Sequence, residues 1–441
     1  MADKDGASSP IQEKSVGIVG LGYVGLPLLL AFRNAGCEVV GIDIDPDKID
    51  LLGRGESYLS HIPATSISRV LAEKTVLSAN MAEIEKIDAV VITVPTPLTH
   101  DMTPDLSFVE STAKELGKHL QVGQLVSLES TTYPGTTREV LIPILESESG
   151  LAAGKDFHVA FSPERVDPGD PDHELTEIPK IVAGLNKESL RLAVDLYSLI
   201  TPEVVPVSTL EVAEMAKLLE NIYRTVNIAL VNEMKMLADR MGLDIWEVIG
   251  AAATKPFGFQ VFYPGPGLGG HCLPIDPFYL DWRAKTKYDF KTQFIELAGR
   301  INASMPDYVL QRTRMALEER GVELGCAKVL LVGMAYKRDI SDTRESPGLK
   351  LMTVLEEAGA KVIYHDPLVP ILPATRDYPL LAGRSSVDLE SGIVGDQDVV
   401  IIVTDHRNID YELLAAEASL VVDTRNAMRD VEGRVAEVVG A

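Results

Sequence analysis

The side chains best suited to chemistry lie in residues 263–279, which read YPGPGLGGHCLPIDPFY. The glycines of this loop permit backbone conformations and close approaches that a side chain would forbid: Gly265, Gly267, Gly269 and Gly270. A thiol in such a loop can meet a ligand, and the carboxylate four residues after Cys272, at Asp276, is near enough to share its site. The pattern favours a nucleophile with a neighbouring acid or base. A turn-rich connector with a buried cysteine is the alternative.

The composition argues against several kinds of binding partner. Among 441 residues, 65 acidic and 41 basic side chains give a net charge of −24, which disfavours nucleic acids and anionic membranes. The cysteines form no disulfide framework, so we expect a soluble protein of the reducing cytoplasm: Cys37, Cys272 and Cys326. No apolar run reaches the roughly 18 residues of a membrane helix. Residues 1–14 are polar and are expected to form a disordered tail, not a signal peptide.

The N-terminal pattern is typical of a dinucleotide-binding fold. A strand predicted at residues 15–20 runs into glycines spaced G-x-G-x-x-G, and a helix is predicted at 26–35. In this context the first glycine permits the tight turn, the second admits a pyrophosphate and the third lets the helix pack on the strand: Gly20, Gly22 and Gly25. The helix N-terminus supplies amides and a dipole for the phosphate charge. A glycine-rich turn that binds nothing is the alternative.

Further strands are predicted at residues 38–42, 89–94, 125–128 and 158–161, and each leads into a polar turn. Ligands of a parallel sheet sit beyond the carboxyl ends of its strands. Asp43 ends the first of these strands, where a carboxylate accepts ribose hydroxyls and repels a 2′-phosphate, so the expected cofactor is NAD and not NADP. Thr96, Thr131 and Glu164 are the candidates in the other turns. Each threonine could instead cap a helix, and Glu164 could be an ordinary surface carboxylate.

A long helix is predicted at residues 208–241, which contain no Gly or Pro. Ser208 and Glu211 fit a capping box at its start. A helix of this length would span about 50 Å, enough to cross between two domains and to form a homodimer contact. We expect buried apolar positions at Leu218, Leu219, Ile222 and Val226. Polar residues at helical spacing form a stripe that is usually a solvated face: Glu214, Lys217, Asn221 and Arg224.

The N-terminal pattern recurs after a helical stretch at residues 290–319, which we expect to break near Pro306. Strand-like segments at 328–334, 358–367, 398–405 and 420–426 parallel those at 16–21, 35–44, 88–95 and 125–131, and Asp366 stands where the first half has Asp43. The first turn of this repeat lacks the glycine fingerprint and carries basic residues. We therefore expect a phosphate-bearing ligand other than an ordinary dinucleotide, held by cations: Lys337, Arg344 and Arg425.

The predicted fold class is α/β, with two Rossmann-like, doubly wound parallel sheets joined by a long central helix and a helical dimerisation region. The expected boundaries place the tail at 1–14 and the NAD-binding domain at 15–206. The central helix, dimerisation region and cysteine loop occupy 207–320, and the second sheet occupies 321–441.

Taken together, these motifs resemble the UDP-glucose/GDP-mannose dehydrogenase family, over roughly residues 15 to 430 and in the family's order. The motifs that carry the resemblance are Gly20-x-Gly22-x-x-Gly25, the Ser130-Thr131 turn, Lys217 with Asn221, GGHCLPID and AYKRDISDTRES. The resemblance implies an NAD-dependent enzyme that oxidises C6 of a nucleotide sugar twice, from alcohol to carboxylate, at one cysteine. It also implies a UDP-sugar substrate for the last domain.

The resemblance also implies roles for individual residues. The catalytic group comprises the nucleophile, the carboxylate paired with it, the helix pair that steadies the C6 oxygen, the acidic residue of a P-E turn and a turn threonine: Cys272, Asp276, Lys217 with Asn221, Glu164 and Thr131. Arg344 matches a residue that reaches the NAD pyrophosphate. The remaining substrate contacts are expected at Arg165, Gly269, Lys337 and Arg425.

This chain departs from the pattern of UDP-glucose members at several positions, and these departures indicate which sugar it acts on. His271 and Ile275 replace residues of the usual GGSC-x-x-K-D loop, and Pro168 stands where a second glutamate is usual. SPERVDPGD and ESTTYPGTT are similar to the branch that acts on UDP-N-acetylhexosamines. HIP at 61–63 and YPGPGLGGHCLPIDPFYL most resemble members that act on UDP-N-acetylglucosamine, so this is the expected substrate. UDP-N-acetylmannosamine and UDP-glucose are the alternatives. A two-electron reductase and a non-catalytic nucleotide-sugar-binding protein are more distant ones.

Overall fold

The structure is a computed structural model of the chain and describes residues 14–59, 62–71, 75–99, 101–165 and 177–441. It divides into two compact units, Met1–Leu219 and Glu220–Ala441. Almost all of the tail expected at 1–14 lies outside the described residues, as does Pro168. Within the described ranges, no helix combines the length and the apolar character needed to cross a membrane.

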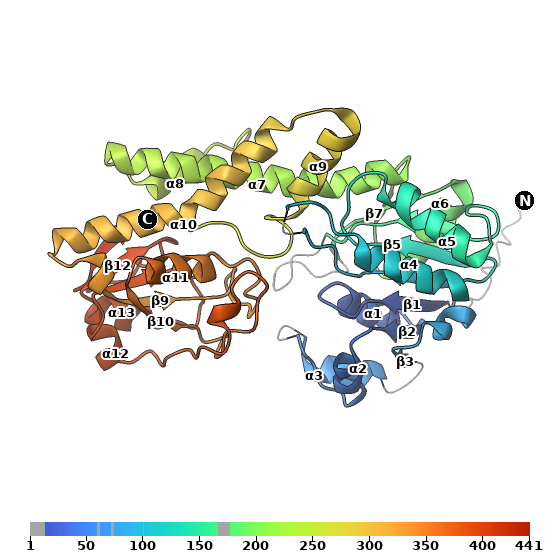
Figure 1. The fold of residues 1–441 in the computed structure, drawn as a ribbon, viewed down its shortest axis with the longest axis horizontal. Coiled ribbons are helices and arrows are strands. Elements are labelled where there is room, and N and C mark those ends of the chain that lie inside the picture. The colour runs from blue at the N-terminus through green and yellow to red at the C-terminus, as the bar shows by residue number, and fades with distance from the viewer. Residues whose placement is uncertain (1–13, 60–61, 72–74, 100, 166–176) are drawn as a thin grey trace, which may run out of the picture. The chain divides into compact units, whose positions relative to one another are not determined.

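The first unit is built on an eight-stranded sheet with the strand order β3-β2-β1-β4-β5-β6-β7-β8 (Figure 1). All neighbouring strands pair in parallel except β6 and β7, which are antiparallel. The strands are β1 Ser15–Val19, β2 Glu38–Ile42, β3 Thr75–Ser78, β4 Ala89–Ile92, β5 Leu125–Leu128, β6 His158–Phe161, β7 Lys180–Gly184 and β8 Val204–Pro206. The helices are α1 Gly25–Asn34, α2 Pro46–Gly53, α3 Ala64–Leu71, α4 Ser107–His119, α5 Ile142–Ser149 and α6 Lys187–Tyr197.

Helices cover both faces of this sheet, which is why its central strands are apolar throughout. Strands β1, β4 and β5 are buried along their whole length. Their alternate residues enter two separate apolar clusters, one packed against α1 and α6 and the other against α4 and α5. The predicted strands at 38–42, 125–128 and 158–161 are confirmed. The short strands β3, β7 and β8 were not predicted.

The second unit contains a five-stranded, all-parallel sheet with the order β10-β9-β11-β12-β13. Its strands are β9 Lys328–Val332, β10 Lys361–His365, β11 Val399–Ile402, β12 Leu420–Asp423 and β13 Glu437–Gly440. Its helices are α8 Ile245–Ala253, α9 Asp276–Tyr288, α10 Gln293–Glu319, α11 Pro347–Glu357, α12 Ser391–Gly395 and α13 Tyr411–Glu417. The order β10-β9-β11-β12 repeats β2-β1-β4-β5 of the first sheet. The predicted internal repeat, and with it the second doubly wound sheet, is therefore confirmed.

The long helix α7 spans Leu210–Met241, 32 residues without interruption (Figure 1). It begins later than the expected capping box, because the Thr209 hydroxyl accepts from the Val212 N–H at 3.2 Å. Glu211 pairs instead with Arg138 at 2.6 Å. The expectation of a Ser208 cap was wrong, since a neighbouring hydroxyl takes that position.

Three apolar positions and the polar stripe of α7 differ from expectation. Leu218 is buried as predicted, whereas Ile222 and Val226 are only partly buried and Leu219 is 59% exposed. Most of the stripe is not a solvated face, since Glu214 is 0% exposed and both Lys217 and Asn221 are 8% exposed. Arg224, its last member, is exposed as expected. The helical period shows which residues share a face, and tertiary packing decides which face is covered.

Helix α10 runs through Pro306 without the expected break. Pro306 is buried and lacks only the N–H that would bond the carbonyl of Asn302. The backbone of Gly267 packs there, because a Cβ added to it would lie 3.5 Å from both the Asn302 oxygen and the Pro306 ring. The expected break at Pro306 is therefore wrong, and the loop backbone packs beside the proline on a continuous helix.

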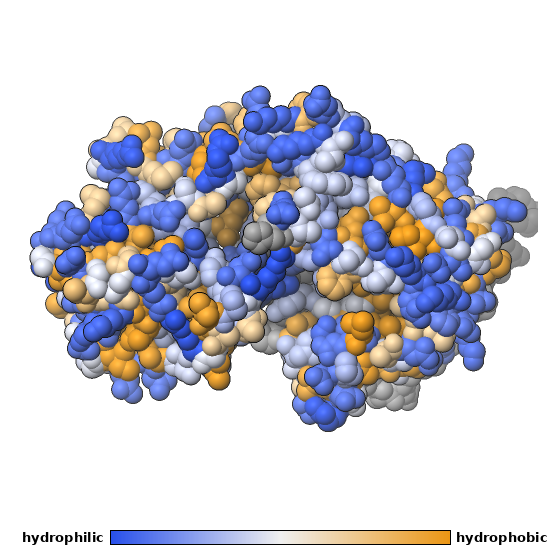
Figure 2. All heavy atoms as spheres, viewed as in Figure 1, coloured by the Kyte–Doolittle hydropathy of each residue, from blue (hydrophilic) through white to orange (hydrophobic). Residues whose placement is uncertain are grey.

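The chain carries a net charge of −24. On the face shown in Figure 2, hydrophilic residues are spread widely and apolar side chains form separate patches among them. Exposed large apolar residues occur along α7, including Leu219, Tyr223 and Leu230. Such a series on one helix is a candidate contact surface.

Candidate active site

The glycine turn after β1 has the geometry of a dinucleotide cradle. Gly20 has a φ of +95°, a conformation that other residues rarely adopt. A Cβ on Gly25 would lie 1.8 Å from the Gly20 oxygen, so the start of α1 can pack on the strand only with glycine there. Among the described residues, nothing lies within 4 Å of the position of a Gly22 Cβ. The turn therefore offers the tight bend and the open backbone that a pyrophosphate needs.

Asp43 lies directly beside this turn at the end of β2. Its Oδ2 accepts from the Leu21 N–H at 2.8 Å and from the Lys48 ammonium at 3.0 Å, and its Oδ1 accepts from the Asp45 N–H at 3.0 Å. A carboxylate has about four acceptor sites, so one remains for a ribose hydroxyl. Sequence reasoning missed Lys48, whose position in the first turn of α2 gave no signal of its own.

The turns after β4 and β5 meet at the same sheet edge. These strands are neighbours, and the Ser130 hydroxyl donates to the Val94 carbonyl at 2.7 Å. Thr96 is 5% exposed and Thr131 is half-buried. The strand order thus brings the two predicted threonines to neighbouring strand ends.

Glu164, after β6, belongs to a buried charged cluster. The Lys180 ammonium lies 2.7 Å from Glu129 Oε2 and 3.1 Å from Glu164 Oε2, with side-chain exposures of 7%, 0% and 11%. Burial raises the pKa of Glu129, against the opposing effect of Lys180. Burial lowers the pKa of Lys180, but both carboxylates outweigh it and the pKa is raised. Sequence reasoning missed this pair, although a lysine in the apolar strand KIVAG signals a buried counter-charge.

Arg165 points its guanidinium at a backbone oxygen of this unit. Its Nη1 donates to the Pro179 carbonyl at 2.8 Å, and its backbone N–H donates to Glu164 Oε1 at 2.6 Å. The expected contact of Arg165 with the sugar stays a prediction.

Helix α7 holds the cysteine loop through its buried polar side chains. The Asn221 amide donates to Asp276 Oδ2 at 2.6 Å, and the Thr225 hydroxyl donates to the Leu273 carbonyl at 3.3 Å. Further along the helix, Asn232 Oδ1 accepts from the Gly265 N–H at 3.0 Å. The predicted stripe therefore includes part of a clamp on the loop. Asn232 is 0% exposed and was missed, because helical spacing alone does not reveal what a polar side chain bonds.

Cys272 and Asp276 meet through the first turn before α9. The Cys272 carbonyl accepts from the Asp276 N–H at 2.8 Å, while Cys272 itself is exposed. Asp276 is 2% exposed and begins the helix, whose N-terminus favours a negative charge. The interpretation of the loop as a connector with a buried cysteine is therefore wrong.

Lys217 lies one turn before Asn221 on α7. It is 8% exposed, and in the described part of the chain no hydrogen bond or ion pair reaches its ammonium. Its Nζ is not among the buried side-chain atoms that lack a partner, so the nitrogen itself keeps some access from outside. A lysine in this state is suited to receive a polar or anionic ligand.

The loop glycines are required by the packing of the loop on the turns of the second sheet. A Cβ on Gly269 would lie 2.5 Å from the Tyr336 Cβ, and one on Gly265 would lie 2.5 Å from the Arg425 guanidinium. The Gly270 N–H donates to the Arg344 carbonyl at 2.9 Å. The loop that carries the thiol is thus packed directly against two of the predicted cationic residues.

The cations of the second sheet have different environments. Arg425 donates from Nε to the Val403 carbonyl at 2.9 Å, and burial together with the nearby Arg338 lowers its pKa to about 10. Arg344 makes a bidentate pair with Asp342, its Nη2 lying 2.6 Å from Oδ2. Burial and the Arg344 charge lower the pKa of His271 to about 4, so this imidazole is neutral at pH 7. Lys337 is half-buried.

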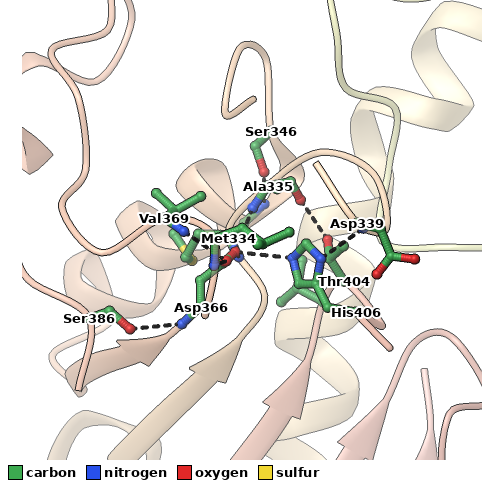
Figure 3. A network of polar contacts seen from close by, with 12 residues as sticks. Met334, Ala335, Asp339, Ser346, Asp366, Val369, Ser386, Thr404 and His406 are labelled. Carbon is green, nitrogen blue, oxygen red and sulfur yellow. Dashed lines mark hydrogen bonds and ion pairs between the residues drawn. The ribbon is translucent and has the colours of Figure 1, made fainter. Parts of the chain in front are cut away.

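Asp366 occupies the place of Asp43 in the repeat, but its acceptors are filled. Figure 3 shows its carboxylate beside the turn after β9, where Oδ2 accepts from Met334 N at 2.6 Å, Ala335 N at 3.0 Å and His406 Nε2 at 3.2 Å. Oδ1 accepts from the N–H groups of Leu368 and Val369 at 2.8 and 3.0 Å. No acceptor site is left for a ribose, which distinguishes this turn from the first.

Comparison with known proteins gives a consistent result. Three domains of the UDP-glucose/GDP-mannose dehydrogenase family match the chain: the NAD binding domain at residues 14–201, the central domain at 211–304 and the UDP binding domain at 330–430. The chain is 35% identical to a UDP-N-acetyl-D-glucosamine 6-dehydrogenase of Pseudomonas aeruginosa over 386 residues, covering 87% of this chain and 90% of that one. It is 34% identical to a UDP-N-acetyl-D-mannosamine dehydrogenase of Pyrococcus horikoshii over 425 residues, covering 94% and 96%.

Solved structures show the same architecture. A UDP-D-ManNAc dehydrogenase from Pyrococcus horikoshii matches with a TM-score of 0.86 and 32% identity over 97% of this chain and 98% of that one. A UDP-glucose dehydrogenase from Pyrobaculum islandicum matches with a TM-score of 0.84 and 27% identity over 96% and 98%. The chain therefore belongs to the UDP-glucose/GDP-mannose dehydrogenase family and is an NAD-dependent nucleotide-sugar dehydrogenase.

Proposed function

We propose that this UDP-sugar 6-dehydrogenase converts UDP-N-acetylglucosamine to UDP-N-acetylglucosaminuronate, in two oxidations at Cys272. The main support is the geometry of the cysteine loop, in which an exposed thiol lies one turn from a buried carboxylate that Asn221 holds at 2.6 Å. A single alcohol oxidation would need no nucleophile. A thiol placed in this way serves a reaction with an acyl-enzyme stage.

The chemistry assigns a role to each polar group. NAD held at the glycine turn would supply the hydride acceptor for C6, with one NAD consumed in each of the two oxidations. Asp276, through water, or Lys217 takes the hydroxyl proton in the first. Cys272 attacks the resulting aldehyde, and the second oxidation leaves a thioester that water hydrolyses with help from Glu164 or Asp276. Lys217 and Asn221 donate to the developing oxyanion, an effect worth about 3 kcal/mol per donor.

The burial of Lys217 supports this assignment. The residue as a whole is 8% exposed and its ammonium has no partner among the described residues, so a negative oxygen at C6 could take up that pairing site. Thr131 is assigned to the same reaction as the turn threonine of the NAD domain. Its neighbour Ser130 anchors that turn at 2.7 Å.

The binding residues follow the domain order. NAD is assigned to Gly20, Gly22, Gly25, Asp43, Thr96, Thr131 and Arg344, and the UDP-sugar to Arg165, Lys217, Asn221, Gly269, Lys337 and Arg425. We place the functional boundaries at 206/207 and 320/321, with the cysteine loop in the middle segment. A reducing cytoplasm suits an enzyme whose nucleophile is a free, exposed thiol.

The N-acetylated sugar is supported by the loop and by the relatives. Ile275 is 8% exposed and takes the place of a lysine usual in UDP-glucose members, which removes a charge beside Asp276. Relatives that act on N-acetylglucosamine and N-acetylmannosamine forms are 35% and 34% identical, too close to separate the epimers. The proposal of the glucosamine epimer therefore depends on the sequence motifs and on a direct assay.

Steady-state rates on UDP-N-acetylglucosamine, UDP-N-acetylmannosamine, UDP-N-acetylgalactosamine and UDP-glucose test the substrate. We expect UDP-N-acetylglucosamine to exceed UDP-glucose in kcat/KM by roughly ten- to hundredfold, because unpaired buried polar groups penalise the sugar without the acetamide. A preference for UDP-glucose would refute the proposal. A preference for the mannosamine epimer would change the substrate assigned to this enzyme but would not affect the proposed mechanism.

We also propose a homodimer formed through α7. Exposed apolar residues recur along the whole helix: Val212, Met215, Tyr223, Leu230, Met234, Leu237 and Met241, with Leu219 between them. Val212, Tyr223 and Met234 are eleven residues apart, a repeat that keeps one apolar stripe on a nearly straight helix. A second copy of the same helix is the natural partner for such a stripe.

Light scattering tests this surface with Leu230→Glu, which places a charge in the middle of the stripe. We expect the variant to be monomeric where the unmodified chain is dimeric. Glu220→Gln on the same helix serves as a control for a change of charge alone. A monomeric unmodified chain, or a variant that remains dimeric, would contradict the proposal.

A further inference from the structure

Two turns at the carboxyl edge of the second sheet are connected by polar contacts, of which the one made by Thr404 is buried. The 333–339 turn follows β9 and carries Lys337 and Arg338, and the 404–407 turn follows β11. The Thr404 hydroxyl donates to the Ala335 carbonyl at 2.6 Å, and Arg338 forms an ion pair with Asp405. Arg407 Nε lies 3.1 Å from Asp339 Oδ2. The contacts define where the backbone of the 333–339 turn lies.

His406 is the buried centre of this network. It is 0% exposed and lies between Asp366 and Asp339 in Figure 3. Its Nδ1 accepts from the Asp339 N–H at 2.9 Å, and its Nε2 lies 3.2 Å from Asp366 Oδ2. A backbone N–H can only donate, so Nδ1 carries no proton and Nε2 donates to the carboxylate. The two contacts together require the neutral imidazole with its proton on Nε2.

The contact with Asp339 acts at a strained point of the chain. Asp339 has a φ of +63°, a left-handed conformation that residues other than glycine rarely adopt. It follows Lys337 and Arg338 directly, so whatever holds its N–H also sets the direction in which those cations leave the turn. Arg338 in turn lies near enough to Arg425 to lower the pKa of that guanidinium.

We propose that His406 is a positioning residue for the diphosphate of the UDP-sugar. It fixes the backbone of Asp339 through Nδ1, is itself fixed by Asp366 through Nε2, and so places Lys337 and Arg338 at the strand ends. His406 touches no substrate in this role. The inference rests on the proposed binding of UDP by the cations of this turn.

Two substitutions separate the two hydrogen bonds. His406→Asn keeps an acceptor at the position of Nδ1 and loses the donor to Asp366, whereas His406→Gln keeps a donor near Nε2 and loses the acceptor for Asp339. UDP affinity is measured by calorimetry for both, together with their melting temperatures. We expect His406→Gln to bind UDP about tenfold more weakly, as the loss of one aligned hydrogen bond predicts, and His406→Asn to stay within about threefold of the unmodified protein.

The controls make each outcome informative. His365→Gln removes a second histidine of the same sheet, whose Nδ1 lies 2.8 Å from the Val387 carbonyl, and should leave UDP affinity unchanged. Lys337→Met tests the cation itself: unchanged UDP affinity in that variant would refute the proposed binding by this turn. If Lys337→Met weakens binding but both His406 variants bind UDP normally, the positioning role is refuted.

A merely structural histidine would give a different result. Losses of affinity that follow the melting temperature in both His406 variants, with no difference between Asn and Gln, would overturn the proposal. If neither variant folds, Thr404→Val removes another buried hydrogen bond between the two turns and is expected to weaken UDP binding by a similar factor. Unchanged UDP affinity in a folded Thr404→Val protein would then count against the proposal.

Discussion

The amide of Asn221 donates to the carboxylate of Asp276 at 2.6 Å and thereby joins α7 to the first turn of α9. Both side chains are buried, with exposures of 8% and 2%. A hydrogen bond to a buried charged group is typically worth about 1.5–3 kcal/mol. This contact therefore contributes to the orientation of the carboxylate that follows Cys272 in the loop.

Replacing Asn221 by Leu should remove that orientation. We expect kcat to fall roughly ten- to hundredfold, because Asp276 loses a partner and the C6 oxygen loses a donor. The change in kcat is compared with that of Asn227→Leu, an exposed contact on the same helix in which Nδ2 donates to the Tyr223 carbonyl at 2.7 Å. Equal effects of the two substitutions would show that the Asn221 contact is not specific to catalysis.

Replacing Cys272 by Ser should stop the reaction before the acid is formed at a useful rate. The thiol is exposed in its loop, and a hydroxyl is a much weaker nucleophile at neutral pH. The measurement is the NADH formed per UDP-sugar, expected to be two for the unmodified enzyme and below two for the variant. Full conversion to the uronate by Cys272→Ser would rule out covalent catalysis. Cys326→Ser, at another exposed cysteine, is the control.

The cofactor preference should favour NAD strongly over NADP. Asp43 lies beside the glycine turn and bonds the Leu21 N–H at 2.8 Å, so a 2′-phosphate would meet a fixed negative charge. We expect Asp43→Asn to reduce kcat/KM for NAD. The ratio of kcat/KM for NAD to kcat/KM for NADP should fall as well. Comparable kcat/KM values for the two cofactors in the unmodified enzyme would show that Asp43 does not select them.

Replacing Lys180 by Met should destabilise the first unit. Two carboxylates, at Glu129 and Glu164, would lose the ammonium that pairs with both, and breaking a buried ion pair typically costs about 3–5 kcal/mol. The double variant Lys180→Met/Glu129→Gln should recover part of that loss, because it removes the more deeply buried carboxylate. Chemical unfolding of both variants is compared with Arg191→Met, which breaks an exposed pair with Glu188. A Lys180→Met protein no less stable than Arg191→Met would contradict this account.

Stability should fall in mild acid because of His271. Burial and the Arg344 charge depress its pKa from 6.5 to about 4 in the folded protein. Protonation therefore favours the unfolded state, so this contribution is complete above pH 6.5 and is lost as the pH falls from 6.5 to 4. We expect the melting temperature of His271→Asn to decline less steeply over this interval. Parallel curves for the variant and the unmodified protein would show that His271 is not the responsible group.

Much of the fold could be predicted from local features of the sequence. Buried parallel strands appear as short apolar runs, and Gly20, Gly22 and Gly25 have a spacing that only a strand-turn-helix unit explains. The terminal carboxylates Asp43 and Asp366 revealed the repeat, and in the structure each accepts from the first backbone N–H groups of its turn. These features can be predicted from the sequence because local backbone geometry imposes each of them on a stretch of only a few residues.

The long-range partners of polar residues could not be read in the same way. Lys180 is separated from Glu129 by much of the first unit, and Asn232 from the Gly265 N–H by the whole of α8. A polar side chain in a strand or helix has many possible partners, and the sequence holds no local trace of the one that packing selects. The lysine in an apolar strand showed that a partner must exist, but did not identify it.

Helix α7 illustrates the difference between what the sequence determines and what only tertiary packing decides. The sequence by itself determined that Glu214, Lys217 and Asn221 share one face and that the helix is long. Only the tertiary structure decided that this face is buried while Leu219 is 59% exposed. The physical reason is that the helical period arises from backbone geometry, whereas burial depends on which distant segments, here the loop at Cys272 and Asp276 among them, pack against that face.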